Sequence, residues 1–351
     1  MKIFYSLLFF TTVLSPIVYS QVGGSSIYTF LNSSSSARAT ALGGTIITDP
    51  GSDLALALEN PAQLNEQMNG QISFQHQFIQ LGIQSGYVGF GKFIPSKKIM
   101  THGAIKYIGY GTFEQTDEFG NQIGEFKGNE VSLQLGASYQ VYEKLHIGAN
   151  VKFIQSSLDV YRSSGMALDL GALYIDTASN FTVGLVIKQM GSQLTSYEDT
   201  RENLPLNVLV GISKRLKHLP FRLSLTWHHL NKWNLLYDDP NSQEGGFFGG
   251  FQLLENEATK TDNFFRHIIF GGEMYLGKKE LLSLRVGYNH QLKQELSVTN
   301  LRSLTGISLG FGFRVKKFQF DYATVRRHFG GSSHHLGLST NLRYFTGNGI
   351  L

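Results

Sequence analysis

Several short motifs in the sequence match catalytic or binding motifs. Gly306, Ser308 and Gly310 fit the G-x-S-x-G pattern of a nucleophile elbow. That motif needs a strained strand-to-helix turn, whereas this serine lies in a regular alternation that predicts a strand. Residues 272–278 resemble the start of a phosphate-binding loop, but Lys279 stands where a Ser or Thr is required. We expect no catalytic or nucleotide-binding site at either motif.

Histidine pairs occur at His228–His229 and His334–His335. Neighbouring side chains on a strand point to opposite faces, so neither pair is expected to hold one metal ion by itself. Acidic pairs at 198–199 and 238–239 fall in predicted loops. Solvated charge, or a divalent ion bridging to lipopolysaccharide, accounts for them more simply than acid–base catalysis. We predict no metal or cofactor site, and we predict that the protein is not an enzyme.

Composition narrows the class of protein further. The 351 residues include 39 Gly, 26 Phe and 16 Tyr but only 7 Pro, which favours many strands and tight turns. The chain has no Cys, which excludes disulfides and thiolate chemistry. Its formal net charge of +4 is too small and too dispersed to indicate binding to nucleic acid. Residues 1–20, with Lys2 before an apolar stretch, are predicted to be a secretion signal.

Residues 130–153 show the pattern that repeats through most of the chain. Apolar side chains at Val131, Leu133 and Leu135 alternate with small or polar ones, and the alternation breaks at 142–144 and then resumes. Because side chains on a strand alternate between faces, this stretch predicts a β-hairpin with one apolar and one polar face. Each strand has about ten residues, enough to cross a bilayer at a tilt of about 45°.

The same alternation predicts about 14 strands in series after residue 70. The fold class is therefore all-β, and we predict a transmembrane antiparallel β-barrel. Short and long connections alternate, as in bacterial outer-membrane barrels, although the short link at 81–82 departs from the pattern. The predicted strands cover residues 70–80, 83–94, 99–114, 128–142, 144–159, 164–176, 180–190, 205–216, 220–233, 264–277, 280–293, 303–315, 317–327 and 334–345.

A water-soluble barrel or sandwich is the alternative, because alternation alone does not say which face meets water. The length of the apolar faces favours the membrane, since strands of soluble sheets usually have about five or six residues. Aromatic residues near strand ends favour it too, as in interfacial girdles: Tyr139, Tyr288, Tyr344, Trp227 and Trp233. Charged residues on the polar faces are expected to pair across the lumen: Asp169, Glu273, Arg285, Arg314, Asp321 and Arg343.

Residues 21–69 lack the strand pattern. Residues 37–42 have the composition of a short helix ended by Gly43 and Gly44, and 54–58 could form a second, capped by Ser52 or Asp53. We predict that residues 21–69 form a small plug or hatch, in the lumen or on its inner mouth, and that residues 70–351 form the barrel. A loosely docked leader is the alternative.

Two motifs in this N-terminal region resemble a known family. Residues 36–44, Ser-Ala-Arg-Ala-Thr-Ala-Leu-Gly-Gly, are followed by Asn-Pro-Ala at 60–62. The pattern is similar to the N-terminal signature of the PorV/PorQ proteins, outer-membrane components of the type IX secretion system and distant relatives of the FadL-type channels. Chain length and residues 54–59 are more similar to PorQ than to PorV. The matching residues are Ala37, Arg38, Ala39, Gly43, Gly44, Asn60 and Pro61.

The resemblance implies a non-enzymatic role in the bacterial outer membrane, in contact with its lipid and lipopolysaccharide. In this family PorQ belongs to a cell-surface attachment complex with PorU, PorV and PorZ, and would hold the soluble PorZ. The predicted outer loop 234–263 carries aromatic residues that suit a protein contact, or that fold into the barrel mouth: Tyr237, Phe247, Phe248 and Phe251. The alternative function is a FadL-like channel for hydrophobic or small polar molecules.

Overall fold

The computed structural model describes residues 26–236, 260–277, 280–296, 304–328 and 331–345. The predicted secretion signal, residues 1–20, lies outside the described residues. The described strands form one closed antiparallel barrel in which each strand pairs with its neighbours in sequence, and β1 pairs with β14 to close the sheet. The prediction of a 14-stranded antiparallel barrel is confirmed.

The strands are β1 (Gln71–Phe78), β2 (Gln84–Ile94), β3 (Ile99–Thr116), β4 (Gln122–Tyr142), β5 (Leu145–Leu158), β6 (Tyr161–Asp176), β7 (Phe181–Thr195), β8 (Asn207–Arg215), β9 (Phe221–Trp227), β10 (Ile268–Leu276), β11 (Leu282–Asn289), β12 (Ile307–Val315), β13 (Phe318–His328) and β14 (Gly331–Asn341). The helices are α2 (Ala37–Ala41), α3 (Lys260–Arg266) and α4 (His290–Leu296), with 3-10 turns η1 (Thr29–Asn32), η2 (Leu54–Leu58), η3 (Pro61–Gln63), η4 (Glu66–Met68) and η6 (Leu342–Tyr344). Among the described residues, no helix is both long enough and apolar enough to span a membrane.

The apolar face of the sheet points outward. On β4, Leu133 and Leu135 are 48% and 62% exposed, whereas Ser132 and Gln134 between them are 0% and 1% exposed. A soluble barrel would have the opposite arrangement, because its apolar side chains would fill the interior. The wall is therefore apolar outside and polar inside, as in barrels that cross a membrane.

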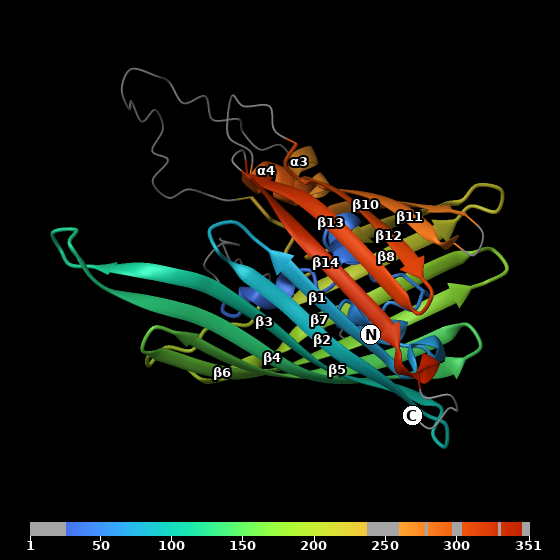
Figure 1. Ribbon diagram of the computed structural model, residues 1–351, viewed down its shortest axis with the longest axis horizontal. Helices are drawn as coiled ribbons and strands as arrows, with labels where there is room; N and C mark the ends of the chain where they lie inside the picture. Colours follow the sequence, from blue (N-terminus) through green and yellow to red (C-terminus); the bar gives the residue numbers. More distant parts are fainter. Residues whose placement is uncertain (1–25, 237–259, 278–279, 297–303, 329–330, 346–351) are drawn as a thin grey trace, which may run out of the picture.

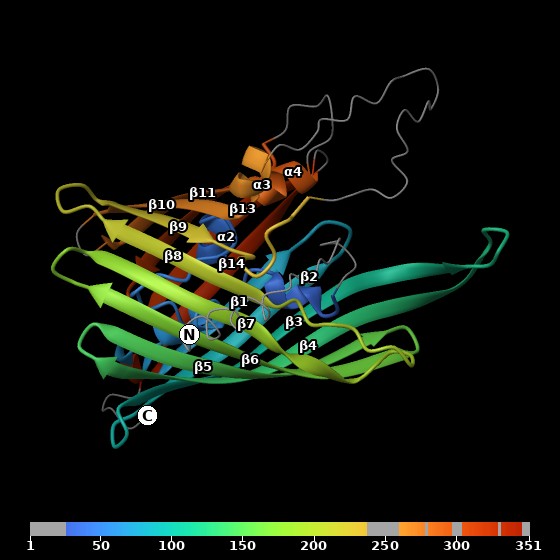
Figure 2. The same ribbon diagram turned by 180° about the vertical axis from the view of Figure 1, so that it is seen from behind.

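The barrel wall is taller on one side than on the other (Figures 1 and 2). Strands β3 to β7 have 14 to 21 residues, whereas β8 to β12 have 7 to 9. The hairpin of β3 and β4 reaches farthest, because most of the loop predicted at 115–127 continues the two strands. The side formed by β8 to β12 is called the short side below.

Two strands, β10 and β11, are shorter than predicted because a helix forms at the end of each strand that adjoins a long connection. Residues 260–266 form α3 where a strand was predicted from 264, and 290–296 form α4 where a strand was predicted to run to 293. Asp262 pairs with Arg266 within α3 at 2.8 Å, and it accepts a bond from His290 of α4 at 2.8 Å. Pairs spaced four residues apart and contacts between the two helices stabilise this local structure, which alternation alone does not reveal.

Candidate functional site: the lumen and its N-terminal segment

The N-terminal segment, defined here as residues 26–69, lies inside the barrel, where both views show its blue ribbon among the strands (Figures 1 and 2). Most of its residues from 27 to 64 are buried. It bonds to strands around the whole circumference, including β1 through Gln75, β5 through Asn150, β10 through Glu273 and β14 through His335. The segment therefore occupies the middle of the lumen rather than resting on the outside of a mouth.

Glycines on the inner face of the wall make room for the segment. A Cβ atom on Gly184 of β7 would lie 2.6 Å from the carbonyl oxygen of Ile47. A Cβ atom on Gly148 of β5 would lie 2.5 Å from the carbonyl carbon of Pro61. Such distances are shorter than real van der Waals contacts, so wall and segment meet this closely only because these positions lack a side chain.

Arg38 of α2 is the centre of a buried ion-pair network. Its guanidinium lies 2.7 Å from Asp49 Oδ2 and 2.7 Å from Glu273 Oε2 of β10. Glu273 also accepts a bond from Arg285 Nε of β11 at 2.7 Å, and Arg285 reaches Asp321 of β13 at 2.5 Å. Arg222 of β9 joins through Asp49. We call this set the arginine cluster: Arg38, Asp49, Arg222, Glu273, Arg285 and Asp321.

The arginine cluster couples the segment to four strands electrostatically. Burial by itself would lower the pKa of Arg38, but Asp49 and Glu273 raise that pKa well above its ordinary value. Arg38 is therefore charged at any physiological pH. A charge left buried without its partner costs several kcal/mol. The ion pairs of Arg38 therefore hold α2 in this position.

A second set of charges ties the segment to the taller side of the wall. Glu59 accepts a bond from Lys188 Nζ of β7 at 3.0 Å. Burial would raise the pKa of Glu59, but Lys188 and Lys106 lower it below the ordinary value. Lys106 of β3 donates to the carbonyl oxygens of Leu31 at 3.2 Å and Ser33 at 2.5 Å. With the Lys152–Asp169 pair at 2.6 Å, these charges form the lysine cluster: Glu59, Lys106, Lys152, Asp169 and Lys188.

The first family-like motif is α2 together with its ends. Ser36 is the N-cap, as expected for a side-chain oxygen at a helix start. Ala37 and Ala39 are fully buried. Gly43 and Gly44 follow α2 with φ of 98° and 110°, backbone angles that L side chains rarely adopt. The short helix predicted at 37–42 is confirmed, and its small residues allow it to lie directly against the wall.

The second motif, Asn60-Pro61, is a buried cap. Asn60 is 0% exposed, its Nδ2 donates to the carbonyl oxygen of Ile47 at 2.9 Å, and its Oδ1 accepts from the amide of Ala62 at 3.0 Å. Pro61 takes the first position of η3, where a missing amide hydrogen costs nothing. The second short helix predicted at 54–58 is present as the 3-10 turn η2, and Asp53 rather than Ser52 caps it.

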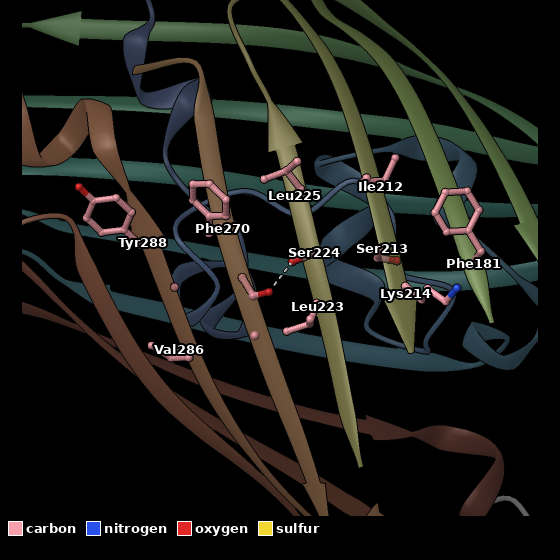
Figure 3. A pocket seen from close by; sticks show the side chains of 13 residues that line it. Phe181, Ile212, Ser213, Lys214, Leu223, Ser224, Leu225, Phe270, Val286 and Tyr288 are labelled. Carbon is pink, nitrogen blue, oxygen red and sulfur yellow. Dashed lines mark hydrogen bonds between the residues drawn. The ribbon is translucent and has the colours of Figure 1, made fainter. Parts of the chain in front are cut away.

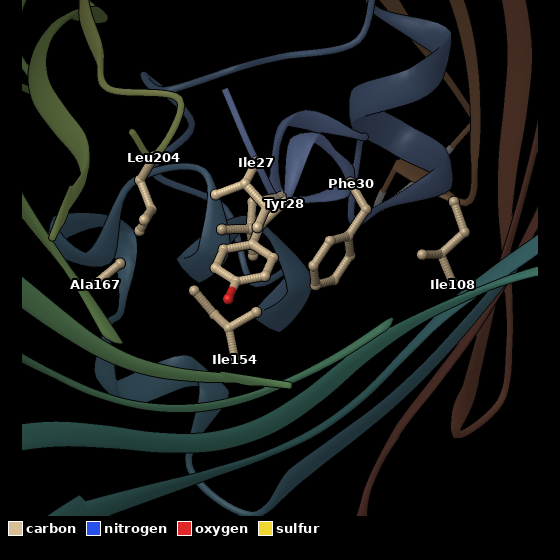
Figure 4. Packing of buried hydrophobic residues seen from close by; sticks show 8 residues of the cluster. Ile27, Tyr28, Phe30, Ile108, Ile154, Ala167 and Leu204 are labelled. Atoms are coloured by element: carbon tan, nitrogen blue, oxygen red, sulfur yellow. The ribbon is translucent and has the colours of Figure 1, made fainter. Parts of the chain in front are cut away.

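An apolar cluster lies in the lumen toward the long connections (Figure 4). Ile27, Tyr28 and Phe30 of the segment pack there against the wall and against the connection after β7. The Tyr28 hydroxyl lies 2.5 Å from Ser163 Oγ, and the Ile27 amide donates to the carbonyl oxygen of Asn203 at 3.0 Å. The buried partners are Leu31, Ile108, Ile154, Ala167 and Leu204.

The candidate catalytic serine and one histidine pair behave as the sequence predicts. Ser308 lies within β12, and its hydroxyl donates to the carbonyl oxygen of Ala41 at 3.0 Å. His335 points inward to Thr40 Oγ1 at 2.8 Å, whereas the exposed His334 bonds to Tyr322. Both groups have structural partners.

The other histidine pair differs from the prediction. His228 and His229 were expected to point to opposite faces, but β9 ends at Trp227 and His229 has a φ of 56°. The two rings consequently turn toward each other, with their Nδ1 atoms 2.5 Å apart. In the described part of the chain, no group of three or more His, Asp or Glu side chains is arranged to hold a metal ion.

Some sequence candidates lie outside this site. Glu198 and Asp199 are exposed in the connection after β7. Arg314, expected to pair across the lumen, is exposed and donates to Gln319 instead. The carboxylates at 238–239 lie outside the described residues, as do the predicted partner-binding aromatics Tyr237, Phe247, Phe248 and Phe251.

The acidic residues of the segment itself are functional groups that the sequence patterns do not reveal. Asp49 and Glu59 both lie in stretches without a motif, yet both accept bonds from basic residues of the wall. Their partners Arg222 and Lys188 occupy inward positions in the strand alternation. Counting the inward basic residues would have indicated that the lumen holds more positive charge than the strand carboxylates can pair.

The fold is similar to that of solved transporters and channels for aromatic hydrocarbons. No protein-family model matches the sequence, and no curated protein matches it. The Pseudomonas putida toluene transporter TodX superposes with a TM-score of 0.53 at 12% identity, covering 88% of this chain and 96% of that one. The Ralstonia pickettii toluene transporter TbuX gives 0.52 at 14% identity, covering 89% and 99%. The monoaromatic hydrocarbon channel CymD gives 0.51 at 14% identity, covering 87% and 96%. At such low identity this likeness describes the fold, and the chain has the barrel fold of these hydrocarbon channels.

Proposed function

We propose that the protein is an integral outer-membrane barrel that acts as a scaffold of the type IX secretion system and holds a soluble partner at the cell surface. The arginine cluster carries this proposal. A segment that moved aside to open the lumen would have to separate Arg38 from Glu273, which lies 2.7 Å away in a buried site, and Asp49 from Arg222. Breaking one buried pair typically costs about 3–5 kcal/mol, so a permanently closed barrel is the simpler role.

The motif positions support the choice of family. The residues that resemble the PorV/PorQ signature hold the segment together and to the wall. Arg38 pairs with Glu273 of β10, and Asn60 donates to the carbonyl oxygens of Ile47 in the segment and Ala172 in β6. Gly43 and Gly44 end α2. The partner would be a surface protein of the PorZ type, within an assembly that also includes proteins of the PorU and PorV types. Tyr237, Phe247, Phe248 and Phe251 are the proposed contact residues.

A FadL-like channel for small apolar molecules is the second candidate. The likeness to TodX and TbuX favours it over the scaffold, and so does the apolar cluster around Tyr28 and Phe30, which offers a dry site inside a polar lumen. Several buried polar atoms, such as Gln77 Nε2 and Ser132 Oγ, have no partner among the described protein atoms. Water usually satisfies groups of this kind, which is compatible with a hydrated path beside the segment.

Co-purification and solute flux distinguish the two functions in one preparation. The full chain is extracted in mild detergent, retained proteins are identified, and the barrel is reconstituted in vesicles for uptake of toluene. A scaffold should retain a stoichiometric surface protein, lose it when residues 237–259 are replaced by a Gly/Ser linker, and pass no toluene. Toluene uptake by a barrel that retains no partner would refute the scaffold and support the channel.

A further inference from the structure

A groove of about 520 Å³ crosses the outer wall from β7 to β11, with most of its length on the short side of the barrel (Figure 3). Two parallel rows of outward side chains border the groove, two residues apart along each strand. The lower row is the one nearer to the short turns that connect β8 to β9 and β10 to β11. The upper row is Ile212, Leu225, Phe270 and Tyr288, and the lower row is Lys214, Leu223, Gly272 and Val286. Apart from Lys214 and the Tyr288 hydroxyl, these two edges are apolar.

Gly272 creates the groove by interrupting the lower row. A Cβ atom on Gly272 would lie 3.5 Å from Val286 and 3.9 Å from Leu223, which are ordinary van der Waals distances. Neither packing nor backbone conformation therefore requires glycine at this position, unlike the inward glycines that meet the N-terminal segment. Behind the gap, Ser224 Oγ donates to the carbonyl oxygen of Gly271 at 3.3 Å.

The dimensions of the groove match one lipid chain. Four strand-to-strand steps from β7 to β11 span roughly 19 Å at about 4.8 Å per step. The rows run perpendicular to strands that tilt by about 45°, so the groove rises by roughly 13 Å, close to half of a hydrocarbon core of about 30 Å. An extended acyl chain from one leaflet would lie along it.

The charge at the lower end indicates which lipid fits. Lys214 is exposed one residue from the end of β8, beside Phe181, and has no ion pair among the described residues. Its neighbour Arg215 is paired with Glu280. Short turns of outer-membrane barrels face the periplasm, so Lys214 lies at the level of inner-leaflet headgroups. An ammonium there attracts phosphate.

We propose that this groove binds one anionic glycerophospholipid of the inner leaflet, with an acyl chain lying over Gly272 and the phosphate on Lys214. The site rests on the membrane location given under Proposed function. It is independent of whether the barrel acts as a scaffold or as a channel, because the groove lies on the outside of the wall.

Photocrosslinking tests the site in the full-length chain. The protein is reconstituted in phosphatidylcholine nanodiscs containing a small fraction of phosphatidylglycerol with a diazirine on its acyl chain, and labelled peptides are identified by mass spectrometry. We expect labelling to concentrate on peptides of β9, β10 and β11. Gly272→Phe should abolish that preference, whereas Gly103→Phe should preserve it, because Gly103 faces outward on β3 and a Cβ atom added there would meet only Leu135 within 4 Å.

Lys214→Gln tests the contact with the lipid headgroup without altering the apolar edges of the groove. It should reduce labelling of the groove peptides by phosphatidylglycerol about fivefold and leave labelling by a phosphatidylcholine probe unchanged. Uniform labelling around the wild-type barrel would overturn the proposal and leave the membrane location intact. Absence of labelling on every strand would refute the membrane location itself.

Discussion

Arg38 NH2 lies 2.7 Å from Glu273 Oε2, although the two residues are 235 positions apart in the sequence. The bond joins a short helix in the lumen to the wall of the barrel on its short side. Around it, two more arginines and two more carboxylates complete a buried network. Because the charges compensate one another locally, the lumen holds them without exposing an unpaired ion.

Replacing Arg38 should strongly destabilise the folded barrel. Arg38→Gln leaves Asp49 and Glu273 with fewer partners in a buried site, and we expect a loss of about 3–5 kcal/mol in the free energy of unfolding. Urea unfolding in detergent micelles, followed by tryptophan fluorescence, measures it. Lys144→Gln is the control, because its pair with Asp176 is 46% and 22% exposed and should contribute at most about 1 kcal/mol. Equal losses in both variants would contradict the role of the cluster.

Filling an inward glycine should displace the segment without altering the outer wall. Gly184→Val places side-chain atoms where Ile47 and Thr48 now lie, so the segment must shift away from β7. Trypsin should then cleave after Arg38, which is 7% exposed in the native fold. Gly103→Val introduces the same side chain on the outer face of β3 and should leave Arg38 protected. Resistance of the Gly184→Val chain to cleavage would show that the segment tolerates the intrusion.

Because of Asp53, the barrel should be more stable at mildly acidic pH than at neutral pH. Burial and, secondarily, the charge of Asp321 raise the pKa of Asp53 from 3.8 to about 6, against the opposing bond from Ser36. Between those values the folded chain retains a proton that the unfolded chain has lost, so the contribution of Asp53 to stability falls as pH rises from about 4 to 6. A shift of about two pKa units corresponds to about 3 kcal/mol.

The Asp53→Asn variant isolates this contribution. The amide oxygen of Asn can still accept the capping bond from the Ala55 amide, and its Nδ2 can donate to Ser36 Oγ, so the variant should be more stable than the parent at pH 7.5 and nearly equal at about pH 4. Unfolding free energies measured across this range provide the comparison, with Asp199→Asn in an exposed connection as the control. A difference between variant and parent that stays constant across the range would exclude the proposed titration.

Charge reversal should test the pair between Glu59 and Lys188 directly. Lys188→Glu places two carboxylates where an ion pair of 3.0 Å now exists, and Glu59→Lys places several lysines together. The double swap restores opposite charges, so it should be more stable than the sum of the single changes predicts, by about 0.5–3 kcal/mol. Additive losses in a double-mutant cycle would indicate that the two side chains are not coupled.

The barrel itself was predictable from local patterns. Alternation such as Val131, Leu133 and Leu135 against Ser132 and Gln134 repeats through the chain, and the structure places the first set outside and the second inside. Short helical stretches were also predictable, because Ser36 and Asp53 are recognisable caps. Predicted boundaries were wrong where α3 and α4 replace strand ends, since ion pairs and helix contacts there outweigh alternation.

Sequence alone therefore determined the class of fold and the short capped helical stretches, because period-two alternation and helix caps depend on neighbouring residues. Only the tertiary structure decided that Arg38 meets Glu273, that Glu59 meets Lys188, and that Gly272 leaves a gap in the outer wall. Those relationships depend on strand register and on the depth of the segment in the lumen. Both are set by packing among residues far apart in the chain.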